Sequence, residues 1–159
     1  MTFQDTIDLV RAKNFVEKNR VCMLTTITPE GRLVSRPMTA LQMDDQGNLW
    51  FMASENAEQT VSLDFDENVN LGFADVPSGQ YLSITGSAKA MKDAKKTAEL
   101  WDSKTAAWYP DGMADPTLCL IRVHPHAAEF WDGVTAKPVL LHGAIRSAAT
   151  ERRSSGARH

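Results

Sequence analysis

The 159-residue sequence has few cysteines, no long apolar run and no excess of positive charge. Its two cysteines, Cys22 and Cys119, lie within apolar segments, which favours reduced core thiols of a cytoplasmic protein over a disulfide. No segment approaches the roughly 20 apolar residues that cross a bilayer, and the acidic N-terminus does not resemble a secretory signal. A formal net charge of −3 argues against a nucleic-acid-binding surface. We therefore expect a cytoplasmic protein with neither a membrane nor a nucleic acid as its partner.

The common catalytic and metal-binding motifs are also missing. The sequence has no G-x-S-x-G, Walker loop, G-x-G-x-x-G, H-E-x-x-H or paired CxxC motif. His124 and His126 could share a strand face as metal ligands, but Pro125 between them favours a kinked strand. Acidic residues are scattered, so their spacing predicts no pair of catalytic carboxylates. We expect no metal site and assign no catalytic residue.

The sequence does contain short β-branched and apolar segments separated by polar turns, together with three stretches of helical periodicity. The helices are expected over residues 2–18, 56–65 and 93–108. The strands are expected over residues 21–28, 33–43, 49–54, 69–75, 80–91 and 117–131, the last interrupted at 124–126. Gly86 within a long strand predicts a bulge or bend of the kind that lets a sheet close on itself. The pattern indicates a mainly β barrel with peripheral helices.

Two regions differ in composition. Residues 1–141 carry the periodic segments and are expected to form a single domain. Residues 142–159 are polar and lack periodicity, so we expect a flexible C-terminal tail.

The segment 33–54 carries the clearest functional signal. It predicts a β-hairpin around the polar turn 44–48. Because side chains alternate along a strand, Arg36 shares a face with Val34 and Met38. A permanent cation then lies on an otherwise apolar face, where burial without a partner is costly. Arg36 therefore reaches an edge, pairs with a distant acid or meets a bound anion.

Other residues could help to hold such an anionic ligand. Arg36 could bind a phosphate through two N–H groups, and Thr39, Ser54 and Gln59 could add hydrogen bonds. The N-terminus of the short helix after the second hairpin strand also favours a phosphate. Trp131 follows a strand end and could pack against a flat ring. Structural alternatives remain open for each: Arg36 paired with an acid, Ser54 capping a helix and Trp131 in the core.

A set of short motifs occurs along most of the chain. They are MLTT (23–26), SRPM (35–38), GNLWFMAS (47–54), NVNL (68–71), YLSITG (81–86), ELW (99–101), DP (115–116) and EFWDG (129–133). In this order, over residues 1–140, they resemble the pyridoxamine 5'-phosphate oxidase-related superfamily of flavin-binding split barrels, and within it the general stress protein branch. The resemblance implies a six-stranded antiparallel split β-barrel with peripheral helices.

The resemblance also implies a homodimer with FMN in clefts at the subunit interface; FAD or a deazaflavin is also compatible with the motifs. Arg36 would hold the phosphate, and Trp131 would come from the partner subunit. Gln59 stands close to the phosphate position. The residues implied around the flavin ring are Pro37, Met38, Thr39, Met52, Ala53, Ser54 and, less directly, Tyr81.

Two departures from the family pattern keep alternatives open. Glu58 and Gln59 stand where members usually carry a lysine for the phosphate. The basic C-terminal segment that grips pyridoxal phosphate in the true oxidases has no clear counterpart, so we do not expect a pyridoxamine 5'-phosphate oxidase. The leading hypothesis is an FMN-binding protein of the general stress type, acting as an oxidoreductase on an unidentified small molecule. The alternatives are a non-catalytic flavin-binding or sensing dimer, and a barrel that has lost flavin.

Overall fold

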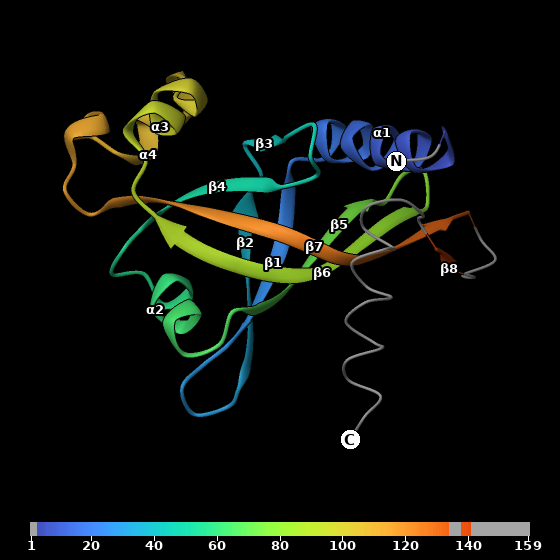
Figure 1. Ribbon diagram of the computed structural model, residues 1–159, viewed down its shortest axis with the longest axis horizontal. Helices are drawn as coiled ribbons and strands as arrows, with labels where there is room; N and C mark the ends of the chain where they lie inside the picture. The colour runs from blue at the N-terminus through green and yellow to red at the C-terminus, as the bar shows by residue number, and fades with distance from the viewer. Residues whose placement is uncertain (1–2, 134–137, 141–159) are drawn as a thin grey trace.

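In the computed structural model the chain forms one curled antiparallel sheet with helices around it (Figure 1). The structure describes residues 3–133 and 138–140, so the predicted tail at 142–159 lies outside the described residues. The strand order is β2-β1-β5-β6-β7-β4-β3, with β8 paired to β7. The strands are β1 (Val21–Ile27), β2 (Leu33–Thr39), β3 (Gln42–Met43), β4 (Leu49–Ser54), β5 (Asn68–Asp75), β6 (Gln80–Met91), β7 (Leu118–Asp132) and β8 (Pro138–Leu140). The helices are α1 (Phe3–Lys18), α2 (Glu58–Phe65), α3 (Ala94–Leu100), α4 (Ser103–Trp108) and the short 3-10 helix η1 (Gly112–Ala114).

The predicted mainly β split barrel is confirmed, with eight described strands in place of six. The predicted strand 33–43 is divided, because the chain changes partners after β2. The Ala40 N–H donates to the Arg20 carbonyl and the Leu41 N–H to the Trp50 carbonyl, both at 2.8 Å. As a result β2 pairs with β1, and only the two-residue β3 pairs with β4. The predicted hairpin is therefore wrong over most of its length.

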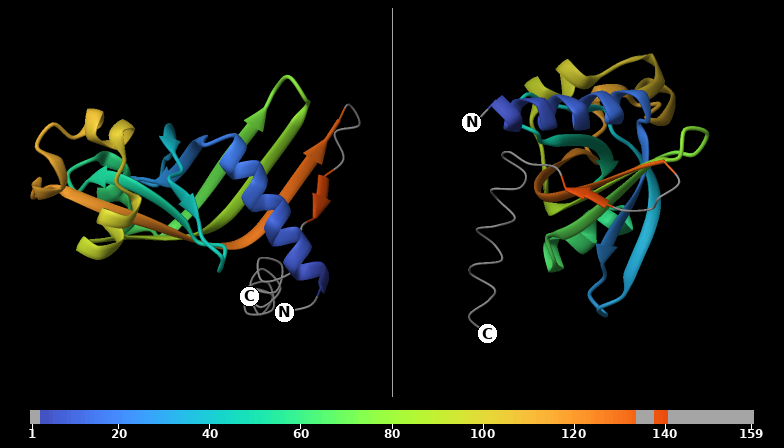
Figure 2. Two further views of the ribbon diagram at one scale, coloured as in Figure 1. Left: turned by 90° about the horizontal axis from the view of Figure 1, so that it is seen from above. Right: turned by 90° about the vertical axis from the view of Figure 1, so that its right-hand side faces the viewer.

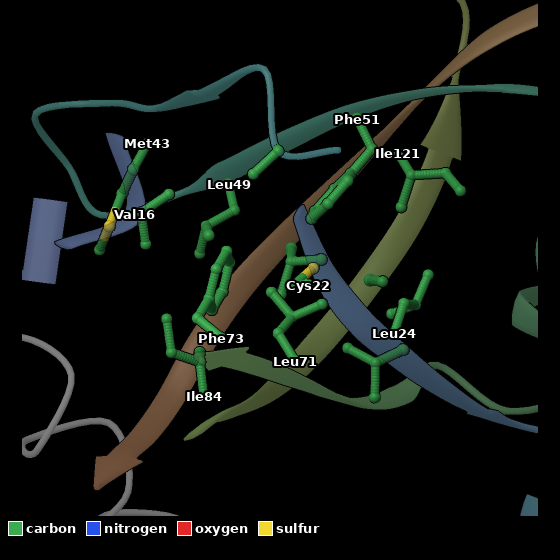
Figure 3. Packing of buried hydrophobic residues seen from close by; sticks show 14 of the residues in the cluster. Val16, Cys22, Leu24, Met43, Leu49, Phe51, Leu71, Phe73, Ile84 and Ile121 are labelled. Atoms are coloured by element: carbon green, nitrogen blue, oxygen red, sulfur yellow. The ribbon is translucent and has the colours of Figure 1, made fainter. Parts of the chain in front are cut away.

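One apolar core fills the curl of the sheet (Figure 3). Alternate residues of β1, β5 and β6 point inward, as Leu24, Leu71 and Ile84 show, and all three are fully buried. Helix α1 packs against the core, with the Phe15 ring edge-on to Phe130 at a centroid distance of 5.3 Å. Burial of each such side chain contributes about 1.5–3 kcal/mol, so the inner face of the sheet is the main source of stability.

Helices α3 and α4 cover the outer surface of β4 and β7 at one end of the molecule (Figure 2). A single helix over 93–108 was expected, but it breaks at Asp102, whose carboxylate accepts from the Thr105 N–H at 2.8 Å and caps a new helix. Trp101 packs on this second cluster, whereas Trp108 is 81% exposed. The fully or mostly buried members of the cluster are Trp50, Met52, Leu118 and Leu120.

The bulge predicted at Gly86 is confirmed. The register between β6 and β7 shifts between Thr85 and Gly86, opposite Pro125. A side chain on Gly86 would overlap the backbone of His124, so only glycine allows the two strands to approach there. The predicted interruption of the last strand is wrong, because the bulge accommodates Pro125, which has no N–H, and β7 runs on through it.

Candidate functional site

Arg36 lies on the inner face of the edge strand β2, where its side chain is half-buried. Its Nη1 donates to the Thr26 hydroxyl at 2.8 Å and more weakly to the Leu24 carbonyl at 3.4 Å. Its Nη2 is buried and has no hydrogen-bond partner in the described part of the chain. An unsatisfied buried donor of a charged group is costly, and native structures rarely tolerate one without a ligand or ion. The guanidinium therefore offers a free donor to an anion.

Two effects act on the charge of Arg36. Burial lowers the pKa of its guanidinium from the usual range, and the negative charge of Glu58 opposes that shift. Arginine nevertheless stays protonated at neutral pH. Among the described ion pairs none involves Arg36, so Glu58 acts on it through space without a direct contact.

Helix α2 brings Glu58 and Gln59 to β2. The Gln59 amide lies 3.6 Å from the Met38 sulfur, which places the first turn of the helix beside the half-buried face of β2. The helix begins at Glu58, two residues later than expected, and its N-cap Ala57 makes no side-chain cap. The first-turn N–H groups therefore lack a side-chain acceptor. The packing of α2 against β2 therefore places the predicted site residues Gln59, Met38 and Arg36 in one region of the molecule.

A cavity of about 330 Å³ adjoins this group, between the β1–β2 loop and α2. Its lining includes two acids, Glu30 and Glu58, and no base. Its other lining residues are Thr28, Pro29, Val61 and Ser62. The volume lies at the lower end of the range for small-molecule sites.

Ser54 lies in the turn that leads from β4 into α2. Its hydroxyl accepts from the Asn56 N–H at 3.2 Å, and its carbonyl accepts from the Ala57 N–H at 3.1 Å and the Thr60 hydroxyl at 2.8 Å. The alternative role of Ser54 as a helix cap is therefore correct only in part. Ser54 stabilises the turn before α2, but the N-cap residue is Ala57. The Ser54 side chain is half-buried beside the N-terminus of α2.

Met52 and Ala53 have buried side chains, Met52 in the cluster under α3 and α4 and Ala53 in the main core. Only their backbone can meet a ligand. Strand β4 pairs with β7 along its whole length but with β3 only at Leu49 and Trp50. From Phe51 onward its other edge has no strand partner in the described part of the sheet, and the outer edge of β2 is likewise unpaired there.

Four predicted site residues lie on the opposite, outer face of the sheet. Pro37 and Thr39 are exposed there, as strand alternation requires. Tyr81 and Trp131 are direct cross-strand neighbours on β6 and β7, three and four strands from β2. One chain therefore does not bring Tyr81 or Trp131 to Arg36. The middle row of this face runs across five strands through Pro37, Met23, Gly72, Ser83 and Glu129.

The remaining sequence candidates form no further centre. His124 contacts Asn48 at 3.2 Å and His126 contacts Ser87 at 3.1 Å, with the two rings 5.5 Å apart. In the described residues no group of three or more His, Cys, Asp or Glu could hold a metal ion. None of the helices in residues 3–133 is long and apolar enough to cross a membrane.

Sequence reasoning missed Thr26, the fully buried hydroxyl that holds Arg36. A signal for it existed. Alternation in 21–27 places Leu24 and Thr26 on one face, and a short turn into β2 sets Leu24 opposite Arg36. The cavity-lining Glu30 was also missed, because its turn carried no sign of facing a helix.

The fold defines a class, the small split β-barrels, here with a half-buried arginine on the edge strand β2. Residues 8–154 match the family model described as pyridoxamine 5'-phosphate oxidase like. The chain belongs to this family, which confirms the predicted resemblance.

Individual relatives agree with this assignment. Over 127 residues, 74% of the chain, it is 27% identical to Protein bli-3 of Neurospora crassa, and the match spans 61% of that protein. Its fold is similar to a protein related to general stress protein 26 from Clostridium acetobutylicum, with a TM-score of 0.74, 19% identity and coverage of 86% of this chain and 94% of that one. It is also similar to the general stress FMN/FAD binding protein of Xanthomonas citri, with a TM-score of 0.68, 28% identity and coverage of 84% and 96%.

Proposed function

We propose that the protein binds a flavin at a site completed by a second copy of the chain, and that the preferred flavin is FMN. The observation that carries this proposal is the buried Nη2 of Arg36, a charged donor without a partner among the described residues. The 28% identical Xanthomonas citri protein is described as FMN/FAD binding, which supports the class of ligand. FAD and a deazaflavin are alternatives that the same titration separates.

The residues around Arg36 fit the phosphate end of such a ligand. Thr26 holds Nη1 of the guanidinium, which leaves Nη2 to donate to a phosphate oxygen. The uncapped N-terminus of the eight-residue α2, next to Gln59, adds backbone donors. The unpaired edges of β2 and β4 offer N–H and C=O groups to the polar rim of a ring.

The outer face supports the proposed homodimer. Val21 and Met23 on β1 are 62% and 46% exposed, and Tyr81 on β6, with only β5 between the two strands, is 41% exposed. Exposed apolar side chains gathered on one face are typical of an interaction surface. A two-fold partner docked there would carry its own Trp131 and Tyr81 toward the edge strand of the first chain, so both faces of the sheet would serve one site.

When bound, a flavin supplies the electron-transfer chemistry through its ring. The chain's own residues then bind, orient and exclude water: Arg36 holds the charge, and the backbone of β2 and β4 positions the ring. Glu58 is the acid whose charge acts on Arg36, and the described lining of the adjoining cavity holds Glu58 and Glu30 without a base that could share a proton. This observation favours a second candidate, flavin binding or sensing without turnover, beside an oxidoreductase acting on an unidentified small molecule.

Flavin binding is tested on the purified full chain. We expect a visible flavin absorbance after FMN is added and excess ligand removed, saturable quenching of flavin fluorescence, and a particle mass of two chains by light scattering. Absence of binding to FMN, FAD and a deazaflavin at saturating concentration would refute the proposal.

Turnover is tested on the loaded protein. Stopped-flow mixing with NADH or NADPH, followed by a panel of electron acceptors, measures reduction and reoxidation of the bound flavin. Turnover with any acceptor supports the oxidoreductase, and complete inertness supports binding without turnover.

A further inference from the structure

The charge around Arg36 is unusual for a site that accepts a phosphate. Glu58 and Glu30 line the adjoining cavity, and Arg36 is the one base among the described residues of this group. A phosphate monoester carries a charge of about −1.5 to −2 at neutral pH. Because the negative charge of Glu58 acts on Arg36, the group offers that dianion less attraction than Arg36 alone would.

The position of Glu58 follows from α2. The contact between Gln59 and Met38 places the first helical turn beside β2, and Arg36 is two residues from Met38 on the same strand face. Glu58 is the first residue of that turn and is exposed to solvent. Its charge acts on the guanidinium, yet Nη2 has no hydrogen bond to any residue that the structure describes. The Glu58 carboxylate and an incoming phosphate would therefore both act on the charge of Arg36.

We propose that Glu58 is a specificity-determining residue: its carboxylate competes with the ligand phosphate for Arg36, so that the site discriminates little between FMN and riboflavin. This inference rests on the flavin binding proposed above. The affinity then comes mainly from the ring, which is held by uncharged backbone edges. Attraction by Arg36 and repulsion by the acids nearly offset each other at the phosphate.

The inference predicts how charge changes at position 58 act. Glu58→Gln removes the repulsion and keeps the side-chain length, so FMN affinity should rise at least about fivefold while riboflavin affinity stays within about twofold. Glu58→Lys adds a second cation and should raise FMN affinity further. Because Glu58 is exposed and makes no ion pair among the described residues, both variants should fold, which thermal melting verifies.

Two other variants serve as controls. Asp64→Asn changes the net charge by the same amount on the same helix, but six positions on, which is about 120° around the helix axis from Glu58. It should leave both affinities unchanged. Glu30→Gln removes the second cavity acid and should raise FMN affinity less than Glu58→Gln, because Glu58 is the acid whose charge acts on Arg36.

The test is a fluorescence titration of each protein with FMN and, separately, with riboflavin. Similar FMN and riboflavin affinities in the wild type, with a rise of the FMN-to-riboflavin affinity ratio in Glu58→Gln and Glu58→Lys but not in Asp64→Asn, support the inference. An unchanged ratio in both Glu58 variants, with flavin still bound, overturns the inference and leaves the proposed function standing. If no variant binds either flavin, both fail.

Discussion

Replacement of Arg36 is the most direct test of the site. Arg36→Met keeps most of the apolar stem and removes the guanidinium, and Arg36→Ala removes both. Within residues 3–133 and 138–140 the guanidinium makes one good hydrogen bond, to Thr26 at 2.8 Å, and Nη2 has no partner. A hydrogen bond to a charged group contributes about 1.5–3 kcal/mol, and an unsatisfied buried donor costs about as much. The two nearly cancel, so the free energy of unfolding should change little in Arg36→Met.

Binding of FMN should change much more. The variant loses a charge-assisted hydrogen bond to the phosphate, worth about 1.5–3 kcal/mol, which corresponds to roughly 10- to 100-fold weaker affinity. Riboflavin has no phosphate, so its affinity should stay within about twofold. Arg36→Lys keeps a point charge without the planar fork and should fall between the wild type and Arg36→Met.

The assay is a flavin-fluorescence titration with both ligands, combined with thermal melting of the free proteins. Melting temperatures within about 4 °C of the wild type would show that the fold is retained. Unchanged FMN affinity in both Arg36→Ala and Arg36→Met would refute the placement of the phosphate at Arg36. An equal loss of FMN and riboflavin affinity would indicate a disturbed ring site and would refute a phosphate-specific role.

Three other predictions address the helix, the bulge and the core. Gln59→Lys should tighten FMN binding about fivefold in the same titration; no change would show that α2 does not face the phosphate. Gly86→Ala should lower the free energy of unfolding by about 2 kcal/mol or more in a urea melt, because its Cβ would lie 2.9 Å from the carbonyl carbon of His124. Gly72→Ala, whose Cβ would have its nearest neighbour at 4.0 Å, is the control and should change it by less than about 1 kcal/mol; equal effects would contradict the bulge packing. Burial raises the pKa of the Cys22 thiol to about 12, so it should not react with a thiol reagent at pH 8 until urea unfolds the chain, and fast labelling of the native protein would contradict this.

Local patterns predicted much of the framework. The apolar alternation of β1 and the bulge at Gly86 were both readable from neighbouring residues, since each depends on contacts within one element or on the backbone freedom of one residue. The errors in the predicted pairing occurred where a strand could pair with either of two other strands. The segment 33–43 was expected to pair with β4 over its whole length, but only Gln42 and Met43 do so, and its first seven residues pair with β1 alone. Alternation is the same for either partner, so it cannot decide between them.

The candidate site divides in the same way. Sequence alone placed Arg36 on a strand face beside Met38, because a period of two is a property of the extended chain. The free donor depends on more than that. Nη2 is free among the described residues because Thr26 of β1 accepts a hydrogen bond from Nη1 only. Helix α2, over twenty residues later in the sequence than Arg36, places Glu58 where its charge acts on the guanidinium without a hydrogen bond to Nη2. Hydrogen bonding and Coulomb forces act over a few ångströms, so only the folding of β1, β2 and α2 against one another decided which groups Arg36 meets.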